Sequence, residues 1–413
     1  MKRIITIFAI FALIFAFGAN MALSAEKQPK EYNLAFITGL SGALAQAAET
    51  QKKAIELLVE QYNAKGGLNM PWGKVPIKLS VADDEMKLDV GVRRFREAVE
   101  AGAHGVSGSI YNPMSAALNE ETKITGTPYM PACVPALDAF KKGNPAPATY
   151  SVAFTPWSIG YLLADALAKG MGKKTMFWQG RPDSWGTVML EGLKDGCKEL
   201  GCEVVGVEEL PRGAPDYSAV INKALAAKAD VFITNMFGGD ATACIKQAYD
   251  MGLHKVSMLV NAWTTYDVGM GIPEEAAAEM YALTYYYYDM DKFSPDLAAR
   301  GKALRDDHMK KYGFPPDAYA VLAYTAVDIM LQATEKAGSI DGKKVGEVLK
   351  TATFNTVKGD AGFREDHQLQ GKYLAFLVKG KAAGDRTNKY DVFEVLGAYG
   401  GEKALPPLKN LGY

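Results

Sequence analysis

From residue 33 onward, short apolar segments alternate with longer segments that carry apolar residues at helical spacing. This alternation constrains the fold more than any other feature of the sequence. The apolar segments 33–37, 75–81, 174–180 and 230–235 are predicted strands, and the segment 184–200 is a predicted helix. Strands that alternate with helices form parallel sheets with helices on both faces. The sequence therefore predicts an α/β fold.

Residues 1–25 follow a different pattern. Lys2 and Arg3 precede an apolar run from Ile4 to Phe17, and small residues follow up to Ala25. This order is typical of a secretory signal peptide. The apolar run is shorter than the roughly 20 residues that a membrane-spanning helix needs. We expect cleavage after Ala25 and export of the remaining chain.

Length and charge limit the domain organisation and the partners. The chain has 413 residues, a net charge of −1 and 48% hydrophobic residues. This chain is longer than a domain built on a single sheet usually is, so the length predicts two α/β lobes. A near-neutral charge argues against nucleic acid as a partner, because phosphate binding needs an excess of basic residues.

Two aromatic-rich segments, near Phe154 and near Tyr287, are candidates for strands that cross between the lobes. The run Tyr285–Tyr288 is predicted to be a β-strand with its rings on alternate faces, because aromatic residues are enriched in strands.

The four cysteines are Cys133, Cys197, Cys202 and Cys244. Export permits disulfides, and the close pair Cys197 and Cys202 is the best candidate for one. A protein with a hydrophobic core of this size does not need a disulfide bond for its stability. We therefore slightly favour four small buried cysteines without a disulfide.

The turn Gly39–Ala43 follows the first predicted strand and resembles sites that hold a nucleophile or a phosphate. A nucleophile elbow has the pattern G-x-S-x-G, but Ala43 replaces the last glycine. The histidines, which are the candidate bases, lie in no recognisable motif: His104, His254, His308 and His367. No phosphate loop or metal-ligand spacing is present, so no cofactor and no metal are expected. An exported serine hydrolase that uses Ser41 is an unfavoured alternative, and Ser41 is expected to cap the following helix.

The turns at the predicted carboxyl ends of the strands carry aromatic and small polar residues rather than catalytic groups. Examples are "GRPDSWG", "MFGGD" and "NAWTTYD". Ligands of open parallel sheets bind outside these ends, where helix N-termini favour acidic groups. The composition predicts a mostly apolar cleft with a few orienting hydrogen bonds.

Several segments in order resemble a known family. They include "LAFITGLSGALAQ", "QYNAKGGL", "DYSAVINKALAAKADVFIT" and "VKGDAGFREDHQLQGKYLAFLVKG". Over essentially the whole mature chain the sequence resembles the periplasmic leucine/isoleucine/valine-type solute-binding proteins of branched-chain amino acid ABC transporters. The resemblance implies two doubly wound parallel-sheet lobes joined by three crossings that close around a ligand. It places lobe 1 at residues 26–153 and 287–363, and lobe 2 at 154–286 and 364–413.

The resemblance also implies a site between the lobes. Asn112 and backbone groups would hold a carboxylate, while Trp185 and Phe237 would close over the ligand. The residues carried over by position are Ser41, Gln46, Tyr111, Asn112, Ala132, Cys133, Val134, Trp185, Phe237, Asn261, Trp263 and Tyr319.

Three positions depart from the family pattern: Ala47 replaces a tyrosine, Val134 replaces a serine or threonine, and Ala262 replaces the acidic partner of the ligand's ammonium group. Burial of an ammonium without a counter-charge costs several kcal/mol. Either Asp240 or Asp267 takes that role, or the ligand is not an α-amino acid.

The resemblance implies a monomeric periplasmic protein that delivers a small organic solute to an ABC permease and catalyses no reaction. The solute would be an amino acid or a related small carboxylate. Binding of aromatic acids or amides is an alternative, since Trp185 and Phe237 suit a flat ligand. A receptor that presents its ligand to a membrane sensor would have the same fold and site, so this alternative stays open.

Overall fold

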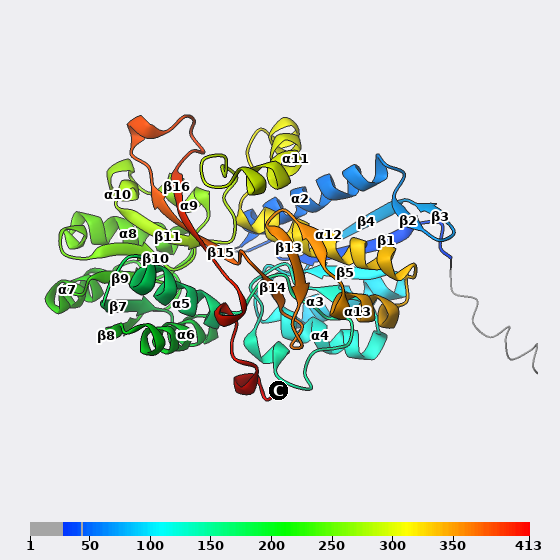
Figure 1. Ribbon diagram of the computed structural model, residues 1–413, viewed down its shortest axis with the longest axis horizontal. Coiled ribbons are helices and arrows are strands. Elements are labelled where there is room, and N and C mark those ends of the chain that lie inside the picture. The colour runs from blue at the N-terminus through cyan, green and yellow to red at the C-terminus, as the bar shows by residue number, and fades with distance from the viewer. Residues whose placement is uncertain (1–27, 43) are drawn as a thin grey trace, which may run out of the picture.

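The computed structural model describes residues 28–42 and 44–413. The predicted signal peptide lies outside the described residues. The described chain forms two α/β lobes, each built around one large sheet (Figure 1). In this part of the chain, no helix has the length and apolar character needed to cross a membrane.

The first lobe contains a four-stranded parallel sheet in the order β4-β1-β5-β6. Its strands are β1 (Tyr32–Thr38), β4 (Ile77–Asp83), β5 (Gly105–Gly108) and β6 (Tyr129–Met130). Alternate residues of β1 enter two different core clusters, with Leu34 and Phe36 in one and Ala35 and Ile37 in the other. Both faces of this sheet are therefore buried, as expected for parallel strands.

Two pairs of helices cover this sheet. Helix α2 packs against α12, and α3 packs against α4. The helices of this region are α2 (Ala45–Asn63), α3 (Leu88–Glu100), α4 (Met114–Thr125), α11 (Pro295–Tyr312), α12 (Ala318–Ala337) and α13 (Gly342–Thr351). A short hairpin joins β2 (Leu68–Met70) to β3 (Gly73–Val75) beside them.

The second lobe contains a seven-stranded sheet in the order β16-β15-β11-β10-β9-β7-β8. Its parallel strands are β7 (Thr175–Gly180), β8 (Glu203–Glu209), β9 (Val231–Thr234), β10 (Met258–Asn261) and β11 (Met280–Thr284). The last two strands, β15 (Ala375–Gly380) and β16 (Phe393–Tyr399), are antiparallel. The prediction of a purely parallel sheet is therefore incomplete, because no crossover helix separates β15 from β16.

The helices of the second lobe are α5 (Pro156–Ala164), α6 (Ser184–Leu200), α7 (Ser218–Ala227), α8 (Gly239–Asp250), α9 (Tyr266–Gly271) and α10 (Glu274–Ala278). Helices α5 and α6 pack closely. A Cβ atom on Gly192 would lie 1.9 Å from the carbonyl oxygen of Trp157, so this contact requires a glycine.

The strands of the two large sheets come from different parts of the chain. The first sheet uses residues 32–130, and the second uses 175–284 and 375–399. A small antiparallel sheet of β12 (Phe354–Thr356), β13 (Gly359–Phe363) and β14 (Leu369–Gly371) lies in sequence between β11 and β15 of the second sheet. The boundaries at 153/154, 286/287 and 363/364 stay predictions.

The tyrosine run does not form the predicted strand. Strand β11 ends at Thr284, and Tyr285, Tyr286 and Tyr287 are all buried in irregular backbone. The Nζ of Lys358 donates to the carbonyl oxygens of Tyr285 (3.2 Å) and Leu374 (2.6 Å). Protein surrounds this segment on every side, so its rings are not divided between a buried and an exposed face.

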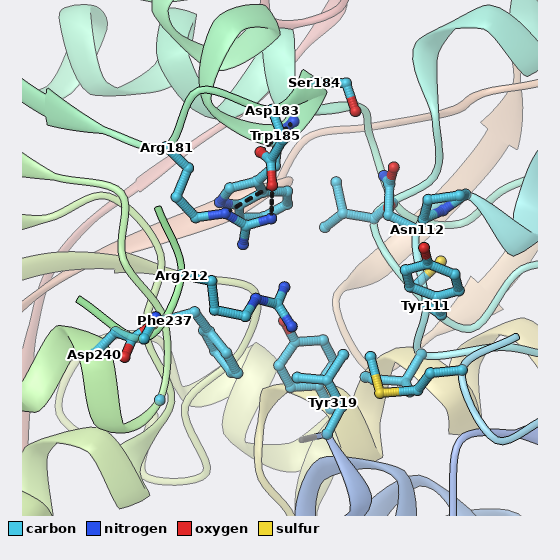
Figure 2. A pocket seen from close by; sticks show the side chains of 18 of the residues that line it. Tyr111, Asn112, Arg181, Asp183, Ser184, Trp185, Arg212, Phe237, Asp240 and Tyr319 are labelled. Atoms are coloured by element: carbon cyan, nitrogen blue, oxygen red, sulfur yellow. Dashed lines mark hydrogen bonds and ion pairs between the residues drawn. The ribbon is translucent and has the colours of Figure 1, made fainter. Parts of the chain in front are cut away.

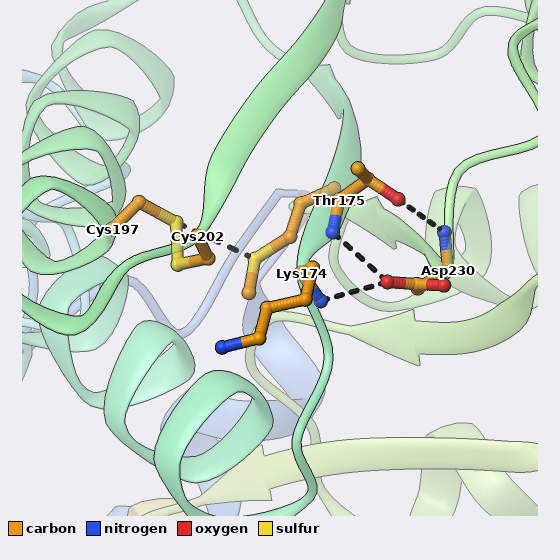
Figure 3. The surroundings of a disulfide bond; sticks show 6 residues. Lys174, Thr175, Cys197, Cys202 and Asp230 are labelled. Atoms are coloured by element: carbon orange, nitrogen blue, oxygen red, sulfur yellow. Dashed lines mark hydrogen bonds between the residues drawn. A yellow bond between two sulfur atoms is a disulfide. The ribbon is translucent and has the colours of Figure 1, made fainter.

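The slight preference for four unpaired cysteines is wrong for two of them. Cys197, near the end of α6, forms a disulfide with Cys202 (Figure 3). The turn residue Gly201 has a φ of +74°, and the two Cα atoms lie 4.4 Å apart. Cys133 and Cys244 are buried free thiols, as expected.

The same figure shows how the start of β7 is fixed. One carboxylate oxygen of Asp230 accepts hydrogen bonds from the backbone N–H groups of Lys174 (2.7 Å) and Thr175 (3.0 Å) (Figure 3). The Thr175 hydroxyl accepts from the backbone N–H of Asp230 (2.9 Å). These contacts align β7 with the start of β9.

Candidate functional site

A pocket of about 710 Å³ lies between the carboxyl ends of the parallel strands of the two large sheets (Figure 2). Its lining comes from the turns after β1, β4, β5 and β6 in one lobe and after β7, β8 and β9 in the other. The starts of α6, α8 and α12 also contribute. The residues that line it are Leu44, Met86, Ile110, Tyr111, Asn112, Pro113, Cys133, Val134, Arg181, Asp183, Ser184, Trp185, Arg212, Gly213, Phe237, Gly238, Gly239, Asp240 and Tyr319.

The wall from the first lobe carries no charged side chain among the described residues. Hydrogen bonds hold its turn in place: the Ile110 N–H donates to the Thr38 hydroxyl (3.2 Å), and Asn112 Nδ2 donates to the Val134 carbonyl oxygen (2.6 Å). Burial raises the pKa of the Cys133 thiol, so this group is neutral at physiological pH. This wall offers neutral polar groups beside apolar surface.

The wall from the second lobe is aromatic and charged. Asp183 accepts hydrogen bonds from the backbone N–H groups of Trp185 (3.1 Å) and Gly186 (3.2 Å), so it caps the start of α6. Trp185 Nε1 donates to the carbonyl oxygen of Asn235 (3.2 Å), which fixes the indole ring. The ring is half-buried and faces the pocket.

An aromatic contact joins the two walls. The Phe237 ring of the second lobe meets the Tyr319 ring of α12 edge to face, with centroids 5.5 Å apart and planes at 83°. Asn261 supports the Phe237 turn, because its Nδ2 donates to the carbonyl oxygens of Thr234 (3.2 Å) and Met236 (2.9 Å). The floor of the pocket is therefore formed from both lobes.

Among the described residues, four charged side chains line the pocket, and all come from the second lobe. Arg181 forms an ion pair with Asp183 (Figure 2). One carboxylate oxygen of Asp240 accepts from the backbone N–H of Gly213 (2.9 Å). Arg212 forms no hydrogen bond or ion pair with any residue in the described part of the chain. Partial removal from water, and then the positive charge of Arg181, lower the pKa of the Arg212 guanidinium, while the charges of Asp183 and Asp240 oppose this shift. The guanidinium remains charged at neutral pH.

Seven of the residues predicted for the site line this pocket: Tyr111, Asn112, Cys133, Val134, Trp185, Phe237 and Tyr319. Their binding role stays a prediction, and so does that of the remaining five. The structure does not place those five in the lining: Ser41, Gln46, Ala132, Asn261 and Trp263.

The five residues outside the lining have other surroundings. Ser41 and Gln46 are exposed, whereas Ala132, Asn261 and Trp263 are buried in the core. Ser41 hydrogen-bonds to Asp83 and does not cap α2, which begins at Ala45. The expected cap is wrong, because the turn after β1 continues beyond Ser41 before the helix starts.

The sequence analysis missed the arginines of the pocket. Arg181 lies in the quoted turn "GRPDSWG", and Arg212 follows the end of β8 by three residues. The rule that carboxyl ends of parallel strands meet at one edge would have found both. Neither arginine belongs to a catalytic sequence motif, so a search for such motifs does not identify them.

Of the two acidic residues considered as replacements for the missing ammonium partner, Asp240 lines the pocket and Asp267 does not. Asp267 instead lies near Asp317, the residue that caps α12. Burial, and then the charge of Asp267, raise the pKa of Asp317 to about 7.

No catalytic arrangement surrounds Ser41 in the described residues. The four histidines stack or pack against other aromatic rings: His104 on Tyr32, His254 on Tyr249, His308 on Phe314 and His367 on Tyr150. Within residues 28–42 and 44–413, no group of three or more His, Cys, Asp or Glu side chains is arranged to hold a metal ion.

Comparisons with known proteins agree with this architecture. The family model described as periplasmic binding protein matches residues 31–385. The leucine-, isoleucine-, valine-, threonine- and alanine-binding protein of Pseudomonas aeruginosa is 23% identical over 373 residues, covering 89% of this chain and 94% of that protein. The Leu/Ile/Val-binding protein homolog 7 of Brucella abortus is 24% identical, covering 82% of this chain and 86% of that protein.

Solved structures show the same fold. An amino acid ABC transporter substrate-binding protein from Pseudomonas fluorescens matches with a TM-score of 0.82 and 23% identity, over 94% of this chain and 99% of that one. A solute-binding protein from R. palustris in complex with benzoate matches with a TM-score of 0.74 and 19% identity, over 91% of this chain and 99% of that one. The fold is that of the type I periplasmic binding proteins, and the chain belongs to the periplasmic binding protein family, among its leucine/isoleucine/valine-binding type.

Proposed function

We propose that this protein is the substrate-binding component of an ABC importer, and that it captures a small organic solute bearing a carboxylate between its two lobes. One observation carries the proposal: the pocket at the carboxyl ends of both sheets takes its walls from both lobes. A solute in this position would contact both walls at once, so its binding would favour a closed arrangement of the lobes.

The lining residues support this ligand class. Trp185, Phe237, Tyr111 and Tyr319 supply flat apolar surface, and Arg212 and Asn112 supply polar groups at separate points. A mostly apolar site with few polar groups is typical of small-molecule pockets. Relatives of this chain are named for leucine, isoleucine and valine, and one similar structure contains benzoate. Amino acids and aromatic acids are therefore the first candidates.

A thermal-shift screen of ligand-stripped protein tests the proposal. The panel would contain branched-chain amino acids, aromatic acids, short amides and small dicarboxylates. A ligand at 100 times its Kd stabilises the folded state by about 2.7 kcal/mol, which shifts a melting curve measurably. No shift with any carboxylate in the panel would reject the proposed ligand class.

The partner needs a separate experiment. We propose a periplasmic monomer that delivers the solute to a membrane permease, and the alternative is a receptor that presents it to a membrane sensor. Uptake into vesicles that contain a candidate ABC permease from the same organism would rise on addition of the loaded protein. Unchanged uptake, with altered output of a sensor, would favour the alternative.

A further inference from the structure

We infer that Arg212 is the specificity-determining residue of the second lobe, and that it receives an anionic group of the ligand. The pocket then selects organic acids whose carboxylate faces the second lobe, over ligands that present an ammonium or a neutral amide there. The inference rests on the proposed function, because it assigns the orientation of a ligand bound in the same pocket.

The first support is that Arg181 and Asp183, two of the other charged side chains of the lining, already bind each other. Arg181 is neutralised by Asp183, whose other carboxylate oxygen caps α6 through the backbone N–H groups of Trp185 and Gly186. Both oxygens of Asp183 are therefore in use. Arg212 is the remaining cation of the lining, and it has no hydrogen-bond or ion-pair partner among the described residues.

The second support is the position of the guanidinium. In Figure 2, the Arg212 side chain extends towards the centre of the pocket, near Tyr319, while Asp240 lies at the edge. Arg212 lies on the loop between β8 and α7, next to Gly213. Asp240 holds this loop through the Gly213 backbone N–H (2.9 Å), so this carboxylate positions the arginine and has one oxygen already engaged.

The third support is the charge of the opposite wall. The described lining from the first lobe has no acidic side chain that would neutralise Arg212 across the pocket. Asp183 and Asp240 of the second lobe attract Arg212 without a hydrogen bond or ion pair to it, so this partly buried cation has no carboxylate in direct contact. A ligand carboxylate would provide that contact and form charge-assisted, bidentate hydrogen bonds with the planar guanidinium.

Calorimetry with two matched ligand series tests the inference. One series is phenylalanine, 3-phenylpropanoate and 3-phenylpropanamide, and the other is leucine, 4-methylpentanoate and 4-methylpentanamide. Wild-type protein is expected to bind the acid of a series at least tenfold more tightly than its amide and its amino acid. Arg212→Gln should weaken acid binding at least tenfold and change amide binding less than threefold, and Arg212→Lys should fall between.

Lys198→Gln is the matched control, because it removes one positive charge from an exposed position on α6 of the same lobe. It should leave all affinities unchanged, and equal melting temperatures would show that both variants fold. Acid binding that persists in Arg212→Gln, or wild-type binding of amino acids and amides as tight as that of acids, would overturn the inference and leave the proposed function intact. Absence of binding in every series would overturn both.

Discussion

Asp317 provides a quantitative test of the structure at the contact between the lobes. It precedes α12 in the first lobe, is only 7% exposed, and accepts a hydrogen bond from the backbone N–H of Ala320 (2.6 Å). Asp267 of α9 in the second lobe adds a second negative charge nearby. The Tyr266 hydroxyl donates to the carbonyl oxygen of Pro315 (3.1 Å), so α9 contacts this same segment.

The pKa of Asp317 determines the sign and the size of its contribution to the pH dependence of stability. Burial, and then Asp267, raise the pKa of Asp317 from 3.8 to about 7 in the folded state. Between about pH 4 and pH 7, Asp317 therefore keeps its proton in the folded protein, whereas in the unfolded chain it has lost this proton. The free energy of unfolding should decline as the pH rises through this window, at about 1.4 kcal/mol per pH unit, or about 4 kcal/mol over the whole window. Above pH 7 this contribution is constant.

The substitution Asp317→Asn isolates the contribution of Asp317 to the pH dependence of the free energy of unfolding. Asparagine keeps an oxygen for the helix cap and does not titrate. Urea unfolding at pH 5, 6, 7 and 8 would give the free energy of unfolding of both proteins. The value for wild type minus the value for the variant should fall by up to about 3 kcal/mol from pH 5 to pH 7 and then level off. Asp328, whose pKa burial raises to about 6, titrates in both proteins and cancels in this difference. A difference that is flat or rises with pH would refute the reasoning.

Three further predictions concern single features. Replacement of Cys197 and Cys202 by serine should lower the free energy of unfolding by about 2 kcal/mol, because the closed loop is short; an unchanged urea midpoint would contradict this. Gly192→Ala should destabilise the protein by about 1–3 kcal/mol, since its Cβ would meet the Trp157 carbonyl oxygen, and an unchanged melting temperature would disprove the contact. Trp185→Ala should weaken ligand binding at least tenfold in calorimetry without loss of folding, with Trp185→Phe intermediate, whereas wild-type affinity would remove Trp185 from the site.

Local patterns of apolar residues in the sequence were sufficient to predict most of the fold. Helix α6 has the predicted bounds Ser184–Leu200, and β1 extends the predicted strand by one residue at each end. Both segments have a strong apolar period and clear flanking turns. The run Tyr285–Tyr288 has strand-forming residues but no neighbouring strand to pair with, and a sequence window does not contain that information.

The candidate site was predictable only in part. Tyr111 and Phe237 lie in turns directly after strands, and Trp185 lies in the first turn of the helix that follows β7, so their position follows from the topology of a parallel sheet. Arg212 comes after a strand too, but its lack of an ion-pair partner depends on which acidic groups lie near it in three dimensions. The hydrogen bond from Gly213 to Asp240 joins residues 27 positions apart, and sequence spacing alone gives no sign of it.

Hydrogen exchange measured by mass spectrometry tests the central claim most directly. Ligand-stripped protein would be compared with protein saturated by the acid that gives the largest thermal shift. We expect the ligand to slow exchange in the turns after β5 and β6 of the first lobe and in those after β7, β8 and β9 of the second lobe. Protection confined to one lobe, or located away from these turns, would contradict capture of the ligand between the lobes.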